Sequence, residues 1–244
     1  PGVLPAGVPL VLRNARRLPE GRAFCVIDRD WVLATYTRAM RPKSSLPSPS
    51  KPVAAPVRGT AAHEIRIIGG QWRRTPIKVL DKPGLRPTPD RVRETLFNWL
   101  GQDLTGWRCV DAFSGTGALG LEAASRGATQ VIALEQEAEL ARHLQQLAER
   151  LKASAVQVQR GDAVGAMQRL SAAAFDVVFL DPPFEGPWFE PALKAAARLV
   201  PVGGWVYLEA PAEWQDEGLA RWGLEVVRHL KAGAVHAHLL RRIA

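Results

Sequence analysis

The sequence predicts an α/β protein with a doubly wound, mostly parallel sheet of seven strands, preceded by an N-terminal β-hairpin and helix. Three observations predict this fold. From residue 107 onward, short apolar runs alternate with helical stretches, as in parallel strands joined by helices. A glycine-rich turn, FSGTGALG (113–120), follows the first of these runs. Two further apolar runs come last, separated only by Lys231-Ala232-Gly233, and predict an antiparallel edge to the sheet.

The predicted elements of the sheet follow from these patterns. Strands are expected at 108–113, 130–135, 155–160, 175–181, 204–210, 224–230 and 234–242. Helices are expected at 117–126, 137–152, 163–171, 188–199 and 213–222. The helix at 137–152 has one apolar face, which we expect to pack on the sheet; its leucines are Leu140, Leu144, Leu147 and Leu151.

A basic extension is predicted at residues 63–100, ahead of the main domain at 101–244. Two β-type runs in EIRIIGGQWRRTPIKVL (64–80) flank Gly69-Gly70 and predict a hairpin. The stretch LRPTPDRVRETLFNWL (85–100) predicts a helix with Thr88 as N-cap and Pro89 in the first turn. Its expected buried stripe is Val92, Leu96, Trp99 and Leu100.

Residues 1–62 are predicted to be a disordered, basic leader. They contain ten Lys or Arg against three Asp or Glu, and 41–60 is rich in Pro and Ser without periodicity. We interpret 1–39 as upstream sequence, with the functional protein starting near Met40; a transit peptide is the alternative. Two cysteines, far apart and in no CxxC, exclude a disulfide scaffold and fit a reducing cytoplasm.

The glycine-rich turn and the acids near it predict the ligand. Gly115, Gly117 and Gly120 match G-x-G-x-x-G, and Glu135 follows twenty residues after the first, as in dinucleotide sites. Asp111, four residues before Gly115, would repel a pyrophosphate but suits a cationic ammonium. This favours S-adenosylmethionine, with glycines for close backbone approach and Glu135 for the ribose hydroxyls.

Asp162, after the third strand, is expected to accept from the adenine amino group, although it could instead cap the following helix. The predicted cofactor site also includes Phe113, Gln136, Ala163 and Asp181.

The sequence Asp181-Pro182-Pro183-Phe184 ends the fourth strand and predicts the catalytic site. An exocyclic amino group on a nucleobase is a poor nucleophile, because its lone pair is delocalised into the ring. Two acceptors, the Asp181 carboxylate and the Pro182 carbonyl, would orient that lone pair, while Pro183 rigidifies the turn and Phe184 stacks on the base. A turn without chemistry is the alternative reading.

These motifs resemble a known family. RIIGGQWRR (66–74), LRPTPDRVRETLFNWL (85–100), DAFSGTGALG (111–120) and DPPF (181–184) together resemble the RsmD family of bacterial class I methyltransferases, over about residues 64–242. The resemblance implies a Rossmann-like fold and methyl transfer from S-adenosylmethionine to N2 of a guanine in 16S ribosomal RNA of a partly assembled small subunit. It implies a cytoplasmic enzyme, which we expect to be monomeric.

Three alternatives compete with this prediction. A DNA amino-methyltransferase would share the chemistry but usually needs a target-recognition domain, for which the chain has no room. A nicotinamide oxidoreductase is disfavoured by Asp111, and the sequence indicates no Tyr/Lys pair or His placed to assist hydride transfer. A non-catalytic RNA-binding assembly factor would have no need for an intact DPPF sequence and glycine turn.

Candidate RNA-binding residues lie in the basic extension. Arginines in 63–100 are expected to bind phosphates, and Trp72 either stacks on a base or packs in the hairpin. The candidates are Arg66, Trp72, Arg73, Arg74, Arg86, Arg91 and Arg93. His236 and His238 share one face of a strand, but the sequence indicates no further ligands, so no metal site is expected.

Overall fold

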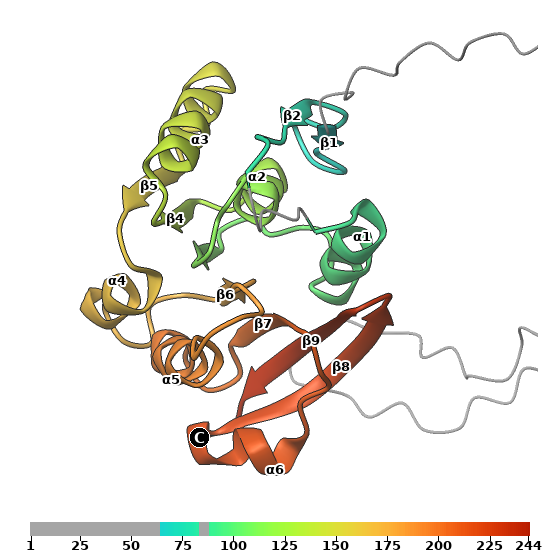
Figure 1. Cartoon of the computed structure of the whole chain (residues 1–244), viewed down its shortest axis with the longest axis vertical. Coiled ribbons are helices and arrows are strands. Elements are labelled where there is room, and N and C mark those ends of the chain that lie inside the picture. The colour runs from blue at the N-terminus through green and yellow to red at the C-terminus, as the bar shows by residue number, and fades with distance from the viewer. Residues whose placement is uncertain (1–63, 83–87) are drawn as a thin grey trace, which may run out of the picture. The chain divides into compact units, whose positions relative to one another are not determined.

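The computed structural model describes residues 64–82 and 88–244 (Figure 1). The predicted leader and Arg86 lie outside the described residues. Within the described part, the α/β prediction is confirmed. No helix of these residues is both long and apolar enough to cross a membrane.

Seven strands form one sheet, in the spatial order β5-β4-β3-β6-β7-β9-β8. All neighbours are parallel except β9, which runs antiparallel to both β7 and β8. In chain order the strands are β3 (Arg108–Asp111), β4 (Gln130–Glu135), β5 (Val156–Arg160), β6 (Val177–Leu180), β7 (Trp205–Ala210), β8 (Leu224–Ala232) and β9 (Val235–Arg242). The chain order reverses between β3 and β6. Sheets of this kind bind ligands at the carboxyl ends of the two strands beside such a reversal, and this position is called the crevice below.

Helices cover both faces of the sheet (Figure 1). One face packs against α1 (Asp90–Trp99), α2 (Ala118–Ser125) and α3 (Ala138–Arg150). The other packs against α4 (Ala163–Arg169), α5 (Phe189–Leu199) and the short α6 (Asp216–Leu219), which a 3₁₀ turn, η1 (Ala220–Trp222), follows. The predicted leucine face of α3 is confirmed: Leu140, Leu144 and Leu147 are buried.

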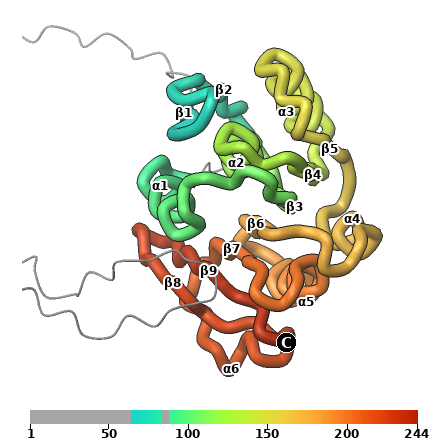
Figure 2. Tube along the Cα trace, turned by 180° about the vertical axis from the view of Figure 1, so that it is seen from behind, coloured from blue at the N-terminus to red at the C-terminus, as the bar shows by residue number. Residues whose placement is uncertain are grey.

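The N-terminal hairpin is confirmed, but its strands are shorter than predicted. β1 (Glu64–Arg66) pairs antiparallel with β2 (Pro76–Lys78), and residues 67–75 form the connecting loop. Both views of the chain place this pair beside α2 (Figures 1 and 2). Gly70 has φ +74°, and a Cβ there would lie 1.8 Å from the carbonyl oxygen of Ser125. The Gly-Gly pair therefore lets the loop backbone lie directly on α2.

The start of α1 differs from its prediction. Pro89 is the N-cap residue, and no side chain caps the helix. The Thr88 side chain instead hydrogen-bonds Glu209 in β7. Val92, Leu96 and Leu100 are buried as predicted, whereas Trp99 is only half-buried. Phe97 and Arg93 share the buried face.

Candidate active site

The glycine turn connects β3 to α2 and lies over Asp111. Gly117 is the N-cap residue of α2 with φ +79°, in the left-handed region that glycine adopts without strain. The amide of Gly120 donates to Oδ2 of Asp111 at 2.9 Å. A Cβ on Gly120 would lie 2.9 Å from the same oxygen. The glycines thus allow the helix start to approach a buried carboxylate.

Asp111 is a strongly perturbed acid. Its side chain is only 2% exposed. Burial raises its pKa to about 7; the hydrogen bond from Gly120 lowers it, and the Glu135 charge raises it further. No cationic side chain of the described residues contributes to this shift. A cationic group bound next to Asp111 would stabilise the ionised form, whereas a phosphate would destabilise it.

Glu135 ends β4 and holds the backbone around the glycine turn. Its Oε2 accepts from the Gly115 amide at 2.7 Å, and its Oε1 accepts from the Glu137 amide at 2.7 Å. Each carboxylate oxygen has a second lone pair, so these bonds leave acceptor capacity toward a ligand. Phe113 is half-buried and Gln136 is exposed, both beside this turn.

Asp162 caps α4, which was the alternative reading of its role. Its Oδ2 accepts from the Gly165 amide at 2.6 Å. The Ala163 side chain is buried in the core, so any ligand contact from Ala163 would have to come from its backbone. Asp162 itself is exposed, and its second carboxylate oxygen has acceptor capacity beside the cap.

The sequence Asp181-Pro182-Pro183-Phe184 follows β6, at the crevice edge. Asp111 in β3 pairs with Phe179 in β6, so Asp181 lies two residues further along toward the same edge. Asp181 is half-buried, Pro182 is buried, and Phe184 is partly exposed. The buried proline fixes the backbone after the strand, while the carboxylate and the ring keep access to solvent.

A buried polar group next to Asp181 was not predicted. The Tyr207 hydroxyl donates to Oε1 of Glu209 at 2.9 Å, and Thr88 hydrogen-bonds the same carboxylate. Burial raises the pKa of Glu209, and burial together with the Glu209 and Asp181 charges raises the pKa of Tyr207 well above its usual value. Glu209 lies near the carboxyl end of β7, so the rule that placed acids at other strand ends could have found it.

The basic candidates do not form one group. Arg66, Arg73, Arg74 and Arg91 are exposed, and Trp72 is half-buried in contact with two apolar clusters. The amides of Gln71 and Trp72 bind the carbonyl and hydroxyl oxygens of Ser125 at 2.8 and 3.0 Å. Ser125 ends α2, at the end remote from the glycine turn. The loop with Arg73 and Arg74 therefore lies toward the amino ends of the parallel strands, whereas Asp181 lies at their carboxyl ends.

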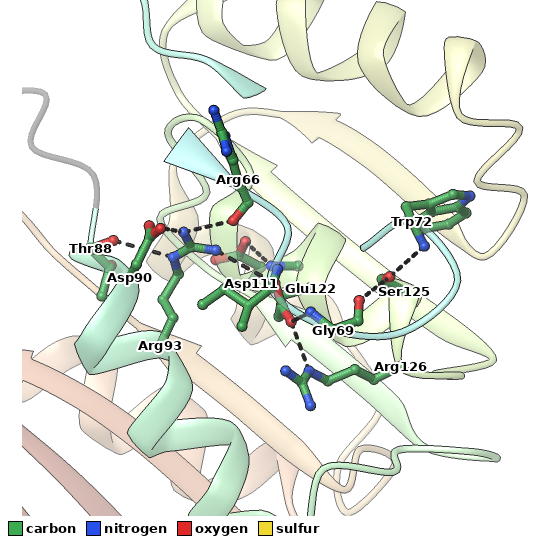
Figure 3. Close-up of polar contacts among 12 residues, drawn as sticks. Arg66, Gly69, Trp72, Thr88, Asp90, Arg93, Asp111, Glu122, Ser125 and Arg126 are labelled. Atoms are coloured by element: carbon green, nitrogen blue, oxygen red, sulfur yellow. Dashed lines mark hydrogen bonds and ion pairs between the residues drawn. The ribbon is translucent and has the colours of Figure 1, made fainter. Parts of the chain in front are cut away.

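Arg93 is buried in a network of polar contacts, which contradicts its prediction as an exposed RNA-binding residue (Figure 3). Its side chain is 0% exposed. It donates to the carbonyl oxygens of Thr88 and Arg66 and to the carboxylate of Asp90. Its Nη1 lies 3.5 Å from Oε2 of Glu122, an ion-pair distance without a hydrogen bond.

Glu122 is the centre of the same network. Its two oxygens accept from the amides of Ile68 and Gly69, both at 2.7 Å, and its Oε1 also accepts from Arg126 at 2.8 Å. Glu122 and Arg93 thus join the hairpin, α1 and α2 (Figure 3). Because Arg93 belongs to this junction, the RNA-binding candidates in the described residues reduce to the exposed arginines and Trp72.

The sheet order, the antiparallel β9 and the acids at successive strand ends define a class I methyltransferase fold. Solved structures of similar proteins support this fold assignment. A proposed methyltransferase of Escherichia coli superposes with a TM-score of 0.64 at 32% identity, over 75% of this chain and 99% of that one. A proposed methylase of Haemophilus influenzae gives a TM-score of 0.62 at 29% identity, over 75% and 100%.

Sequence comparison gives the family. Residues 65–241 match the family model described as conserved hypothetical protein 95. The chain is 39% identical over 191 residues to ribosomal RNA small subunit methyltransferase D of Escherichia coli, covering 74% of this chain and 91% of that protein. It is 43% identical over 137 residues to the protein of the same name from Haemophilus influenzae, covering 55% and 71%. The chain belongs to this family, and the resemblance to RsmD is confirmed.

Proposed function

We propose that the chain transfers a methyl group from S-adenosylmethionine to the exocyclic N2 of a guanine in the 16S RNA of the small ribosomal subunit, in the cytoplasm. The relatives named ribosomal RNA small subunit methyltransferase D support the RNA class. The observation that carries the chemistry is the adjacency of β3 and β6, which brings Asp111 and Asp181 to one crevice. Amino-group specificity rests on the DPPF sequence.

The residues at the crevice fit the cofactor. The buried Asp111 suits the cationic amino-acid end, and Glu135 at the end of β4 suits the ribose hydroxyls. Gly120 keeps the backbone free of a Cβ atom where it passes the Asp111 carboxylate, and Gly117 does the same where it passes Leu144. When bound, the sulfonium supplies an electrophilic methyl group. Three carboxylates at neighbouring strand ends favour this ligand over a pyrophosphate-containing one.

Asp181 and the Pro182 carbonyl act by positioning. Both accept hydrogen bonds from the guanine amino group and turn its lone pair toward the methyl donor. Pro183 helps hold the Pro182 carbonyl in place, because a proline restricts the backbone of the residue before it, and Pro182 is itself buried. Phe184, partly exposed beside them, stacks on the flat base. Once the methyl group has been transferred, the nitrogen loses a proton, which Asp181 accepts or passes to water.

One experiment tests the proposal. Small subunits from cells lacking this methylation are incubated with the enzyme and methyl-labelled cofactor, and the RNA is digested to nucleosides. We expect label in N2-methylguanosine, lost with Asp181→Ala. Arg169→Gln, on the exposed surface of α4, is the matched control and should retain full incorporation. Label in another nucleoside would overturn the assignment of the target atom, and no label in RNA would overturn the function.

A further inference from the structure

Three histidines and a glutamate gather at the hairpin of β8 and β9. In the register, His229 pairs with His238, and Lys231 pairs with His236. Cross-strand partners lie on one face of the sheet, so the three histidines and Lys231 project to the same side. Glu213 belongs to the loop that follows β7. The sequence suggested only His236 and His238; the pairing of β8 with β9 adds His229.

Donor atoms of three of these residues lie close together. His229 Nε2 and His236 Nδ1 are 3.0 Å apart, and a Glu213 carboxylate oxygen is 3.6 Å from His229 Nδ1. One ligand atom from each of the three residues can be chosen so that all lie within 4.8 Å of one another. We propose that Glu213, His229 and His236 form a binding site for a divalent transition-metal ion of the zinc type.

The distances suit such an ion. Two imidazole nitrogens on one tetrahedral zinc ion, at about 2.0–2.1 Å each, are about 3.3 Å apart. The two nitrogens therefore need to separate only slightly from 3.0 Å. The Glu213 carboxylate, which contacts Nδ1 of His229, has to turn toward the Nε2 side of that ring, which its exposed position allows. Imidazole and carboxylate are the ligands that zinc commonly takes, with water in the remaining position.

His238 organises the site without serving as a ligand. The Trp214 amide donates to its Nε2 at 3.0 Å, and its Nδ1 lies 3.4 Å from the Leu208 carbonyl oxygen. Both ring nitrogens are therefore occupied. Its ring stacks on His229 with centroids 4.8 Å apart. Because Trp214 follows Glu213 directly, this contact also holds the loop that carries the carboxylate.

Charges around the cluster affect the ion in opposite directions. Glu213 supplies the negative charge that neutralises part of a divalent ion. Lys231, exposed and opposite His236, is a cation on the same face and weakens binding. Removing its charge is therefore expected to increase metal affinity.

Calorimetric titration of the untagged, chelator-treated full chain with zinc chloride tests the site, and cobalt absorption reports the ligand set. We expect one ion per chain, with His229→Gln and His236→Gln weakening affinity at least about tenfold. Glu213→Gln, in an exposed loop, should weaken it without affecting the fold. His143→Gln on α3 is the matched control and should bind as wild type, whereas Lys231→Gln should bind more tightly.

Absence of saturable zinc binding up to about 100 μM, or unchanged affinity in both His229→Gln and Glu213→Gln, would overturn the site. Melting temperatures without metal show whether each variant is folded, and zinc should raise that of the wild type by mass action. The titration contains neither RNA nor S-adenosylmethionine, so its result is independent of the methyl-transfer proposal.

Discussion

Replacing Glu122 by Ala is expected to be among the most damaging single changes in this protein. The substitution removes the acceptor for the amides of Ile68 and Gly69 and the carboxylate facing Arg93 and Arg126. Glu122 and Arg93 are both 0% exposed, so water cannot replace the lost partner. Breaking a buried ion pair from one side costs about 3–5 kcal/mol.

That cost predicts a measurable shift in melting temperature. For a domain of this size, each kcal/mol corresponds to about 2–4 °C, so Glu122→Ala should melt about 6–20 °C below wild type. Glu122→Gln should lose less, because its amide oxygen can still accept from one backbone amide. Circular dichroism melts measure both. Glu149→Ala, at an exposed site on α3, is the control and should change stability by less than about 0.5 kcal/mol.

Hydrogen exchange locates the effect. If Glu122 holds the hairpin, the amides of Ile68 and Gly69 should exchange faster in Glu122→Gln, while the β4 amides keep their protection. A melting temperature for Glu122→Ala within about 2 °C of wild type would refute the argument, since a buried charge network cannot lose its central acid without cost.

Four further outcomes are expected. Asp181→Ala should lower the methylation rate at least about 100-fold with little change in cofactor affinity, and retention of activity in Asp181→Asn would favour positioning over proton acceptance. Glu135→Ala should weaken S-adenosylmethionine binding by about 1–3 kcal/mol in calorimetry, with NAD showing no saturable binding. Reversing Arg73 and Arg74 to Glu should weaken RNA binding and flatten its salt dependence, whereas Arg150→Glu on α3 should not. Because the pKa of Asp111 is raised to about 7, a cofactor that requires the ionised carboxylate should bind about fivefold more tightly at pH 7 than at pH 6, and Asp111→Asn should abolish that difference.

Sequence patterns predicted the parallel sheet well because each element carried its own signal. β4 begins and ends at the predicted residues, and the other strands differ by one or two residues at their ends. Local pattern also placed Asp111, Glu135 and Asp181 at strand ends. The order of strands then brought Asp111 and Asp181 together, as expected for a doubly wound sheet.

The errors fell on polar residues buried by tertiary contacts. Arg93 looked like part of a basic surface because arginine is rarely buried, and its burial depends on Glu122, which lies 29 positions later in the sequence. The sequence ALGLEAAS (118–125) could have indicated this burial. A helix that is apolar on every side is buried on every side, so its one acid, Glu122, is buried with it and needs a buried partner. His229 was missed for a similar reason, because only the β8–β9 register places it opposite His238 and so within reach of His236.

The position of the basic loop constrains how RNA can lie on this enzyme. α2 starts at the glycine turn and ends at Ser125, and its eight residues span about 12 Å. The loop bearing Arg73 and Arg74 binds the far end of α2, while Asp181 lies at the crevice edge. An RNA that contacts both arginines and presents guanine to Asp181 must therefore extend along the face formed by α1 and α2. A single isolated nucleotide cannot reach both positions, so RNA binding by this loop would require a larger RNA structure around the target guanine. The proposed small-subunit substrate meets that requirement, whereas a short oligonucleotide does not.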